Sequence, residues 1–411
     1  MENIIVGIDV GTSKVCTIIG RVDKDNQIDI LGKGIESCSG VKKGVIVDIE
    51  STAVSIKNSV ERAENMANLK VKSAYVNIMG THVSILNNKS YLDIMGENRE
   101  IKVEDVDKAL YSTKNVVIPD DRKIIDIIPR QYIVDGYDEI KDPIGMVGSR
   151  LEVEADIVAG KITSVQNIVK SLERADIRID GIVIEALATG DMALSVDEKD
   201  MGVILIDIGG GITDISVFKK KNLLFYDSIP VGGDHITNDI SIGLKIPYAE
   251  ADRIKKEYAI ALTSLIKNDQ DIVVSDINGS NKKDVKVSEV VEIIEARIYE
   301  IFSLCKKLLD QANLNDSFRV GVVLTGGGIV YFDGCREIGL EILEMPVNLA
   351  DYRQSEIDKV EYATAAGIVK YISRRHKGSD YGSEIKIQKQ KTASKEFKLF
   401  DKISRIFRSL F

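Results

Sequence analysis

The chain contains one motif twice, and this repeat constrains its fold more than any other feature of the sequence. The first copy, from Ile4 to Val22, reads IIVGIDVGTSKVCTIIGRV, and the second, from Gly202 to Lys219, reads GVILIDIGGGITDISVFK. Each copy has the apolar run of a buried strand, then Asp-x-Gly, a short Gly/Ser/Thr turn and a second alternating strand. Two such hairpins in the two halves of a chain predict two related α/β domains that face each other.

Length and composition predict a folded protein of two or three domains with no nucleic-acid partner. The chain has 411 residues, of which 44% are hydrophobic and 29% are charged, as in ordinary globular proteins. Its net charge of -9 argues against nonspecific binding of nucleic acid. Four widely spaced cysteines and three histidines favour reduced thiols over disulfides, and argue against a zinc site.

The sequence also predicts a cytoplasmic protein. The first three residues lead directly into an apolar strand from Ile4 to Ile8, with no basic region or cleavage site of a secretory signal before it. A run of about 18 apolar residues, which a membrane-spanning helix needs, does not occur in the sequence.

The two repeated turns have the composition of a phosphate-binding site. Glycines let the backbone approach a phosphate without a clash at Cβ, and successive turn N–H groups form an anion-binding nest. Hydroxyls add donors, and a lysine supplies charge for the β- or γ-phosphate. The candidates are Gly11, Thr12, Ser13 and Lys14 in the first turn, and Gly209, Gly210, Gly211 and Thr213 in the second. Either hairpin alone is typical of an ordinary β-turn, but the pair favours a shared site.

The aspartates of the two turns, Asp9 and Asp207, are candidates for metal binding within that nucleotide site. A carboxylate repels a phosphate, so we expect these side chains to hold a hydrated Mg²⁺ through its waters, several of which the ion normally keeps. Asp207 is also a candidate for a catalytic role, although the pattern assigns none firmly.

A third glycine-rich motif strengthens the nucleotide hypothesis. The segment from Val322 to Ile329 reads VVLTGGGI, a buried strand that ends in a turn where backbone can lie against an adenine or its phosphates. It lacks the GK[ST] of a Walker loop and the GxGxxG of a dinucleotide-binding fold. Its candidate site residues are Thr325, Gly326, Gly327 and Gly328.

The order of these motifs resembles the actin and chaperone ATPase superfamily, which also includes sugar kinases. The resemblance implies ribonuclease-H-like domains duplicated around a cleft that binds ATP or ADP with Mg²⁺. It adds Gly232 and Gly233 near the phosphates, and Asp252 and Lys255, one helical turn apart, at the ribose and adenine. Glu185 resembles the carboxylate that orders the metal's waters, with a catalytic role as a further candidate; a simple helix N-terminal acid explains it equally well.

Residues 81–160 predict a small α+β insert. The pattern indicates a short amphipathic helix from Val103 to Lys114 and strands at 123–128, 131–134 and 151–158. A nucleophile–base pair and a metal cluster are both missing from this part of the sequence, so we interpret it as an interaction module.

The insert resembles that of the bacterial cell-division protein FtsA family. The resemblance rests on two groups of motifs: PRQY with VDG, from Pro129 to Gly136, and KDPIGM with RLE, from Lys141 to Glu152. It extends from Ile4 to about Lys370. It implies that the insert joins monomers into filaments and binds other division proteins, and that a subdomain at about 230–310 binds the C-terminal peptide of the tubulin-like ring protein FtsZ.

Two residues on a predicted helix are candidates for the FtsZ contact. Arg297 and Glu300 lie one turn apart in a stretch that is similar to the family. A solvated pair at i,i+3 is an alternative at least as good for either residue alone.

The C-terminal segment predicts a membrane anchor. Residues 377–394 are polar and contain Gly and Ser, as in a flexible linker. Residues 395–411 follow as a helix with an apolar arc of roughly 140° and a basic opposite side. Such a helix suits the interface of a membrane with anionic lipids, although docking on its own domain is the alternative. The apolar arc contains Leu399, Phe400, Ile403, Ile406, Phe407, Leu410 and Phe411.

The sequence thus predicts an actin-like α/β fold with an α+β insert and a C-terminal amphipathic helix. We expect the first actin-like domain at 1–80 and 161–200, and the second at 201–376. The expected location is the cytoplasmic face of the membrane at the division site. The alternatives are a pilus-assembly actin homologue that binds an inner-membrane partner, and a sugar-kinase-like phosphotransferase.

One departure from the family pattern bears on ATP hydrolysis. Ile212 occupies a position where DIGGGTTD would place a threonine, so an aliphatic group replaces a hydroxyl near the γ-phosphate. Thr213 is the next residue and, in a strand, faces the other way. The hypothesis is that ATP acts mainly as a conformational and assembly ligand, with slow hydrolysis at most.

Overall fold

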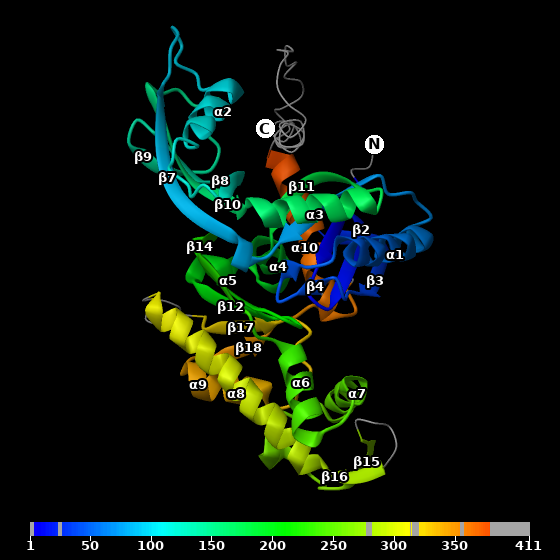
Figure 1. Ribbon diagram of the computed structural model, residues 1–411. Helices are drawn as coiled ribbons and strands as arrows, with labels where there is room; N and C mark the ends of the chain where they lie inside the picture. The colour runs from blue at the N-terminus through cyan, green and yellow to red at the C-terminus, as the bar shows by residue number, and fades with distance from the viewer. Residues whose placement is uncertain are drawn as a thin grey trace.

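The computed structural model describes residues 4–23, 27–276, 282–312, 314, 320–353 and 357–378. Two five-stranded sheets lie one above the other, a four-stranded sheet projects to one side of the upper sheet, and helices extend below the lower sheet (Figure 1). The molecule is therefore elongated, with the N-terminal hairpin in its upper half and the repeat of that hairpin in its lower half.

The first sheet has the strand order β11-β6-β1-β2-β3. Its strands are β1 (Ile5–Val10), β2 (Lys14–Val22), β3 (Ile28–Ser37), β6 (Ser73–Ile78) and β11 (Arg178–Ile184). The helices around it are α1 (Ile49–Ala67), α3 (Ile162–Arg174), α4 (Glu185–Ala193) and α10 (Ala363–Gly378). Short elements near its edge are β4 (Val41–Lys42), β5 (Val45–Ile46) and η1 (Gly80–His82). In the predicted hairpin β1 runs antiparallel to β2, with Asp9 opposite Cys16, and it lies parallel to β6 on its other side.

The second sheet repeats this arrangement with the order β14-β13-β12-β17-β18. Its strands are β12 (Val203–Ile208), β13 (Thr213–Lys219), β14 (Asn222–Ile229), β17 (Val322–Thr325) and β18 (Val347–Leu349). Asp207 of β12 lies opposite Asp214 of the antiparallel β13, and β12 is parallel to β17. The duplicated α/β fold that the repeat predicts is confirmed.

Helices and a small hairpin complete the lower half. The elements are α5 (Val196–Met201), α6 (Gly233–Leu244), α7 (Tyr248–Tyr258), η2 (Thr263–Leu265), β15 (Asp271–Ser275), β16 (Lys282–Lys286), α8 (Val287–Gln311) and α9 (Cys335–Leu343). The short helix η3 (Val360–Tyr362) follows them in sequence and contacts β2 and α10 of the first half. Helix α8 buries Ile294, Ile298, Phe302 and Cys305, a stripe with helical spacing. This stripe belongs to the core that α8 shares with α6 and the second sheet.

Helix α10 packs on the first sheet, although it follows the second sheet in sequence. A Cβ built at Gly7 of β1 would lie 2.3 Å from the Ala365 carbonyl oxygen, and one at Gly367 would lie 1.9 Å from the Ala188 carbonyl oxygen. Only glycine at both positions permits this close approach of backbones. We therefore assign residues 363–376 to the first half of the molecule, which corrects their predicted place in the second domain.

The insert forms a sheet of its own with the order β7-β10-β8-β9. Its elements are β7 (Val83–Asp93), α2 (Val103–Ser112), β8 (Arg122–Val134), β9 (Tyr137–Ile140) and β10 (Arg150–Lys161). The alternation of burial along β10 places Leu151, Val153 and Ala155 in a core with α2.

Strand β8 differs from its prediction as two strands, 123–128 and 131–134. Pro129, which lacks an N–H donor, suggests a break in sequence. In the structure the ladder passes from Gln131 opposite Glu154 to Pro129 opposite Ala155, so one extra residue of β8 forms a bulge. The bulge lets a single strand contain the proline, and the predicted helix ends at Ser112 rather than Lys114.

The predicted anchor lies outside the described residues, because these end at residue 378. Helix α10 extends to Gly378, so the first two residues of the predicted linker belong to its last turn. Within the described ranges, the structure has no helix that combines the length and apolar character required to cross a membrane.

Candidate functional site

The three glycine-rich motifs come together in one cleft of about 850 Å³ between the two halves. Backbone hydrogen bonds hold the second motif against the third and against the start of α6. The Gly328 N–H donates to the Ile208 carbonyl at 2.7 Å, and the N–H groups of Gly233 and Asp234 donate to the carbonyls of Gly209 and Gly210 at 2.9 and 2.7 Å. The predicted site residues that line the cleft are Asp9, Gly11, Thr12, Ser13, Lys14, Glu185, Asp207, Gly209, Gly210, Gly211, Gly233, Asp252, Lys255, Gly326, Gly327 and Gly328.

Glycine is required where the third motif meets the second. Gly326 has a φ of +91°, and a Cβ there would lie 2.3 Å from Asp207 Oδ1. A side chain at this position would strain the backbone and displace the carboxylate. The TGGG turn therefore sets the position of Asp207 as well as one wall of the cleft.

Three predicted positions do not line the cleft, which corrects their assignment. The Thr213 hydroxyl donates to the Val231 carbonyl at 2.8 Å, because alternation along β13 directs this buried side chain away from the cleft. The Thr325 hydroxyl bonds to the Tyr352 hydroxyl at 2.6 Å. Gly232 lies just before α6 and is absent from the cleft lining as well.

Four carboxyl groups gather at the floor of the cleft, with Asp214 buried and Asp9, Glu185 and Asp207 partly buried. Burial, reinforced by the negative charges of Asp207 and Asp214, raises the pKa of Asp9 to about 8. Burial and Asp214 raise the pKa of Asp207 to about 7, and burial raises the pKa of Asp214 to about 6. Burial also raises the pKa of Glu185 well above its usual value. Such a concentration of acids favours a bound cation that would offset their mutual repulsion.

These carboxyl groups fit a hydrated ion better than a directly coordinated one. Among the described residues, no three acidic, histidine or cysteine side chains are arranged to hold a metal directly. Mg²⁺ keeps several waters when it binds near phosphates, so ligation through water suits the predicted role of Asp9, Asp207 and Glu185.

Asn77 and Asp214 are part of this cluster, but the sequence analysis did not select them. The Asn77 side-chain N–H donates to Asp9 Oδ1 at 2.7 Å and to Glu185 Oε2 at 3.0 Å. It thus orients one carboxylate from β1 and one from α4. The sequence around Asn77 contains no motif that marks it as a site residue. Asp214 directly follows Thr213, and because successive side chains of a strand point to opposite faces, Asp214 faces the cleft.

Ile212 forms an apolar contact across the cleft. It is 4% exposed, and a Cβ built at Gly44 of the first half would lie 2.1 Å from Ile212 Cδ1 and 2.9 Å from the Met79 sulfur. The aliphatic side chain thus packs against Gly44 and Met79 at the position where the family pattern has a hydroxyl. This contact places an apolar group, rather than a hydroxyl, at position 212 of the cleft lining.

In another part of the cleft lining, Lys255 is buried and bonded within the second half. Its ammonium donates to Thr237 Oγ1 at 2.6 Å and to the Gly233 carbonyl at 3.1 Å, and it pairs with Asp252 at 3.3 Å. Burial lowers the pKa of Lys255. These bonds hold α7 against the start of α6, so Lys255 shapes this end of the cleft as well as lining it.

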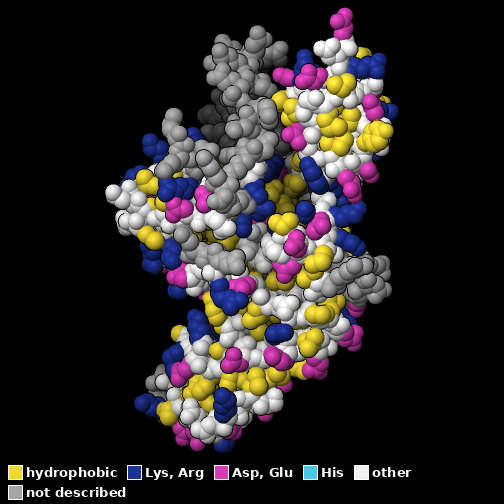
Figure 2. Space-filling view, turned by 180° about the vertical axis from the view of Figure 1, so that it is seen from behind, with side chains coloured by type: hydrophobic (Ala, Val, Ile, Leu, Met, Phe, Trp, Pro, Cys, Tyr) yellow, Lys and Arg dark blue, Asp and Glu magenta, His cyan; other side chains and the backbone are white. Residues whose placement is uncertain are grey.

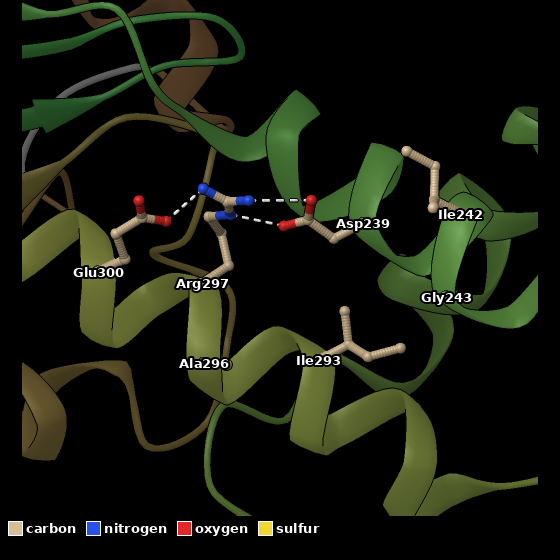
Figure 3. Close-up of a pocket in the computed structure, with 7 residues that line it drawn as sticks. All are labelled: Asp239, Ile242, Gly243, Ile293, Ala296, Arg297 and Glu300. Carbon is tan, nitrogen blue, oxygen red and sulfur yellow. Dashed lines mark hydrogen bonds and ion pairs between the residues drawn. The ribbon is translucent and has the colours of Figure 1, made fainter.

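Arg297 and Glu300 lie at one end of a separate groove of about 390 Å³ between α6 and α8. Figure 3 shows Arg297 between two acids: its guanidinium donates to Asp239 Oδ1 at 2.9 Å and also pairs with Glu300. The other lining residues are Ile242, Gly243, Ile293 and Ala296. The groove therefore has apolar side chains along its length and charged side chains at one end. Ile242 is 67% exposed, so this apolar surface is open to solvent.

Two family models of cell-division proteins match the chain. The model for cell division protein FtsA matches residues 204–367, and the model for the SHS2 domain inserted in FtsA matches residues 80–159. A model for type IV pilus assembly protein PilM matches residues 142–263.

Solved structures of actin-like proteins share the fold. A PilM–PilN type IV pilus biogenesis complex superposes with a TM-score of 0.60 at 13% identity, over 90% of this chain and 98% of the other. MreB5 of Spiroplasma citri bound to AMPPNP gives a TM-score of 0.54 at 15% identity, over 91% and 96%. These structures establish the actin-like architecture, which confirms the predicted fold class.

Curated relatives extend the similarity to nearly the whole chain. Cell division protein FtsA of Bacillus subtilis is 37% identical over 90% of this chain and 83% of the relative. FtsA of Pseudomonas aeruginosa is 35% identical over 92% of this chain and 94% of the relative. The chain belongs to the FtsA family of cell-division proteins.

Proposed function

We propose that this protein binds ATP and Mg²⁺, polymerises, and tethers FtsZ to the cytoplasmic face of the membrane at the division site. The observation that carries the proposal is the convergence of three glycine-rich motifs and four carboxyl groups on one cleft. The AMPPNP-bound and ADP-bound MreB5 structures, which share the fold, support nucleotide as the occupant.

The residues present fit a magnesium nucleotide. Asp9, Asp207 and Glu185 would hold the hydrated ion, and Lys14 and the glycine turns would contact the phosphates. When bound, the ion would neutralise charge on both the phosphates and the carboxylates. Asn77 keeps two of those carboxylates oriented by donating to both of them.

The groove between α6 and α8 supports the FtsZ contact. An extended or helical peptide can bury an apolar side chain against Ile242 and Ile293, while its polar groups meet Arg297 and Glu300. The acids beside Arg297 fix its side chain, which lowers the entropy cost of binding. This arrangement favours a partner site over a merely solvated ion pair.

The insert supports contacts with other copies of the chain and with further division proteins. Several of its large apolar side chains are exposed, and Figure 2 shows hydrophobic side chains gathered on its surface. These exposed side chains are Tyr91, Met95, Tyr111, Val117, Tyr137 and Val147. Apolar side chains exposed on a small module are typical of protein–protein contacts.

Membrane attachment rests on the sequence of residues 395–411. Its apolar arc would enter the interface, and each Lys or Arg on the opposite side adds about 1 kcal/mol near anionic lipid. Sedimentation with anionic vesicles tests this part of the proposal. Full-length protein that stays in the supernatant at low salt would argue for a helix docked on its own domain.

A pilus-assembly role is the second candidate, because the PilM model matches residues 142–263. Such a protein would bind a peptide from an inner-membrane partner rather than FtsZ. Fluorescence anisotropy with a labelled FtsZ C-terminal peptide separates the two functions. Saturable binding supports the FtsZ tether, and no binding at high protein concentration supports the pilus alternative.

We expect ATP turnover far below the about 10 s⁻¹ of a typical enzyme, and we expect Ile212→Thr to raise it. The threonine hydroxyl would restore a donor beside the phosphates, and one well-placed donor raises rates by about 10²-fold in favourable sites. Phosphate release under single-turnover conditions measures the effect. A matched control is Ile215→Thr, since Ile215 is buried in β13, just after this turn, and does not line the cleft. Equal rates for wild type and Ile212→Thr would contradict this role of the aliphatic side chain.

A further inference from the structure

Two polar connections link the first hairpin turn to the second half, one of them through Glu361. The Lys14 ammonium donates to Glu361 Oε1 at 2.8 Å, and the Tyr331 hydroxyl donates to Glu361 Oε2 at 2.9 Å. The Ser13 hydroxyl donates to Asp234 Oδ2 at 2.6 Å. Neither Glu361 nor Asp234 was selected from the sequence, because each lies far along the chain from the turn that it contacts.

The elements that hold Glu361 make it a bridge between the halves. Lys14 begins β2 of the first sheet, and Tyr331 follows the glycine-rich turn after β17 of the second sheet. Glu361 lies in η3, where the chain returns to α10 on the first sheet. Both oxygens of one carboxylate are therefore used, one toward each half of the molecule.

Glu361 also lies beside the place that a nucleotide would occupy. It lines the same cleft as Lys14, and a Cβ built at Gly327 would lie 3.2 Å from its Cγ. The Glu361 side chain is 17% exposed and that of Lys14 is 41% exposed. The pair is thus partly open to solvent, and the hydrogen bond from Tyr331 fixes the carboxylate that receives the lysine.

We propose that Glu361 is a positioning residue which, held by Tyr331, ties Lys14 to the second half and slows the release of a nucleotide bound between the halves. This inference rests on the proposed nucleotide binding. Release requires the halves to separate, and separation breaks the chain of contacts that runs from Lys14 through Glu361 to Tyr331. Association begins before these contacts form, so the effect falls on the dissociation rate.

Stopped-flow measurement of fluorescent ADP with full-length protein and Mg²⁺ tests this role. Glu361→Gln keeps the shape of the side chain but removes its charge, and we expect about two- to fivefold faster dissociation, in keeping with a partly exposed pair. We expect the association rate to change less than about twofold. Tyr331→Phe should accelerate dissociation in the same direction but less strongly.

The chain offers a matched control in Glu341→Gln. The Tyr299 hydroxyl donates to Glu341 at 2.7 Å, an equivalent tyrosine–glutamate bond that lies wholly within the second half. This variant should release ADP at the wild-type rate. Wild-type dissociation from Glu361→Gln would overturn the inference alone, and slower dissociation would show that Glu361 competes with the phosphates instead. Failure of the wild type to bind ADP at all would overturn the proposed nucleotide binding as well.

Discussion

Arg297→Glu should reduce binding of the FtsZ C-terminal peptide by at least about 30-fold, the effect of losing an interface residue worth about 2 kcal/mol or more. Arg297 lies between Asp239 and Glu300, so the change places three carboxylates together at the charged end of the groove. The substitution removes the ordered guanidinium donor that a peptide meets. The mutual repulsion of the three carboxylates also disfavours the arrangement of this end of the groove. Fluorescence anisotropy with a labelled peptide gives the dissociation constant.

Arg253→Glu is a matched control for that experiment. Arg253 pairs with Glu250 and Glu257 on α7, so it too is an arginine between two acids in the lower half. It is absent from the groove lining, and its replacement should leave peptide affinity unchanged. Because charge repulsion could also disturb the fold, Ile242→Asp provides a second variant at an exposed position. Wild-type affinity in both Arg297→Glu and Ile242→Asp would place the peptide elsewhere.

Asp207→Asn should stabilise the protein in EDTA at pH 8 and weaken its affinity for the magnesium nucleotide. The Asp207 carboxylate costs folding free energy because it is buried near Asp214, with its pKa raised to about 7. Removing that charge should raise the free energy of unfolding by about 1–4 kcal/mol. Loss of a group that orients the metal's waters typically costs about 10- to 100-fold in affinity. Urea unfolding and nucleotide titration of the same sample measure both effects.

The direction of the pH dependence follows from the raised pKa of Asp207. The folded protein binds this proton more tightly than the unfolded chain, so the contribution of Asp207 to wild-type stability falls as the pH rises from about 4 to about 7. The asparagine variant lacks this titration. Its advantage should therefore be largest above pH 7 and should disappear as the pH approaches 4.

Asp191→Asn is the control, because Asp191 is a buried aspartate that is surrounded by cations rather than by other carboxylates. Asp191 pairs with Lys199 at 2.5 Å and with Arg374, so its charge stabilises the fold. Its replacement leaves two cations without their carboxylate and should cost about 3–5 kcal/mol. An Asp207→Asn protein that is less stable than wild type at pH 8 would contradict the account of the carboxyl cluster.

Local patterns were sufficient to predict the fold and most of the cleft lining. The repeated Asp-x-Gly hairpins and the TGGG turn each combine a buried strand with a backbone requirement that only glycine meets, as Gly326 shows. Such features can be recognised within a few residues of sequence. The alternation of side chains along β13 can also be recognised from the sequence. It directs Thr213 away from the cleft and places Asp214 in the cleft lining instead.

The residues that sequence analysis missed act over long separations. Asn77, Asp234 and Glu361 reach the first hairpin from other elements, and their local sequence carries no sign of this role. The position of α10 on the first sheet depends on close backbone contacts at Gly7 and Gly367, which become apparent only in three dimensions. Tertiary contacts therefore determine which residues hold the side chains of the site in place, whereas local sequence determines its glycine-rich turns.

Co-sedimentation with phosphatidylglycerol vesicles tests the tether most directly. It compares the full-length protein with a chain that ends at Ser394, each with Mg²⁺, ATP and a labelled FtsZ C-terminal peptide. We predict that the full-length protein pellets and carries the peptide with it, that the truncated chain binds peptide but stays in the supernatant, and that full-length Arg297→Glu pellets without peptide. Full-length protein that stays in the supernatant, or that pellets without the peptide, would contradict the proposed function.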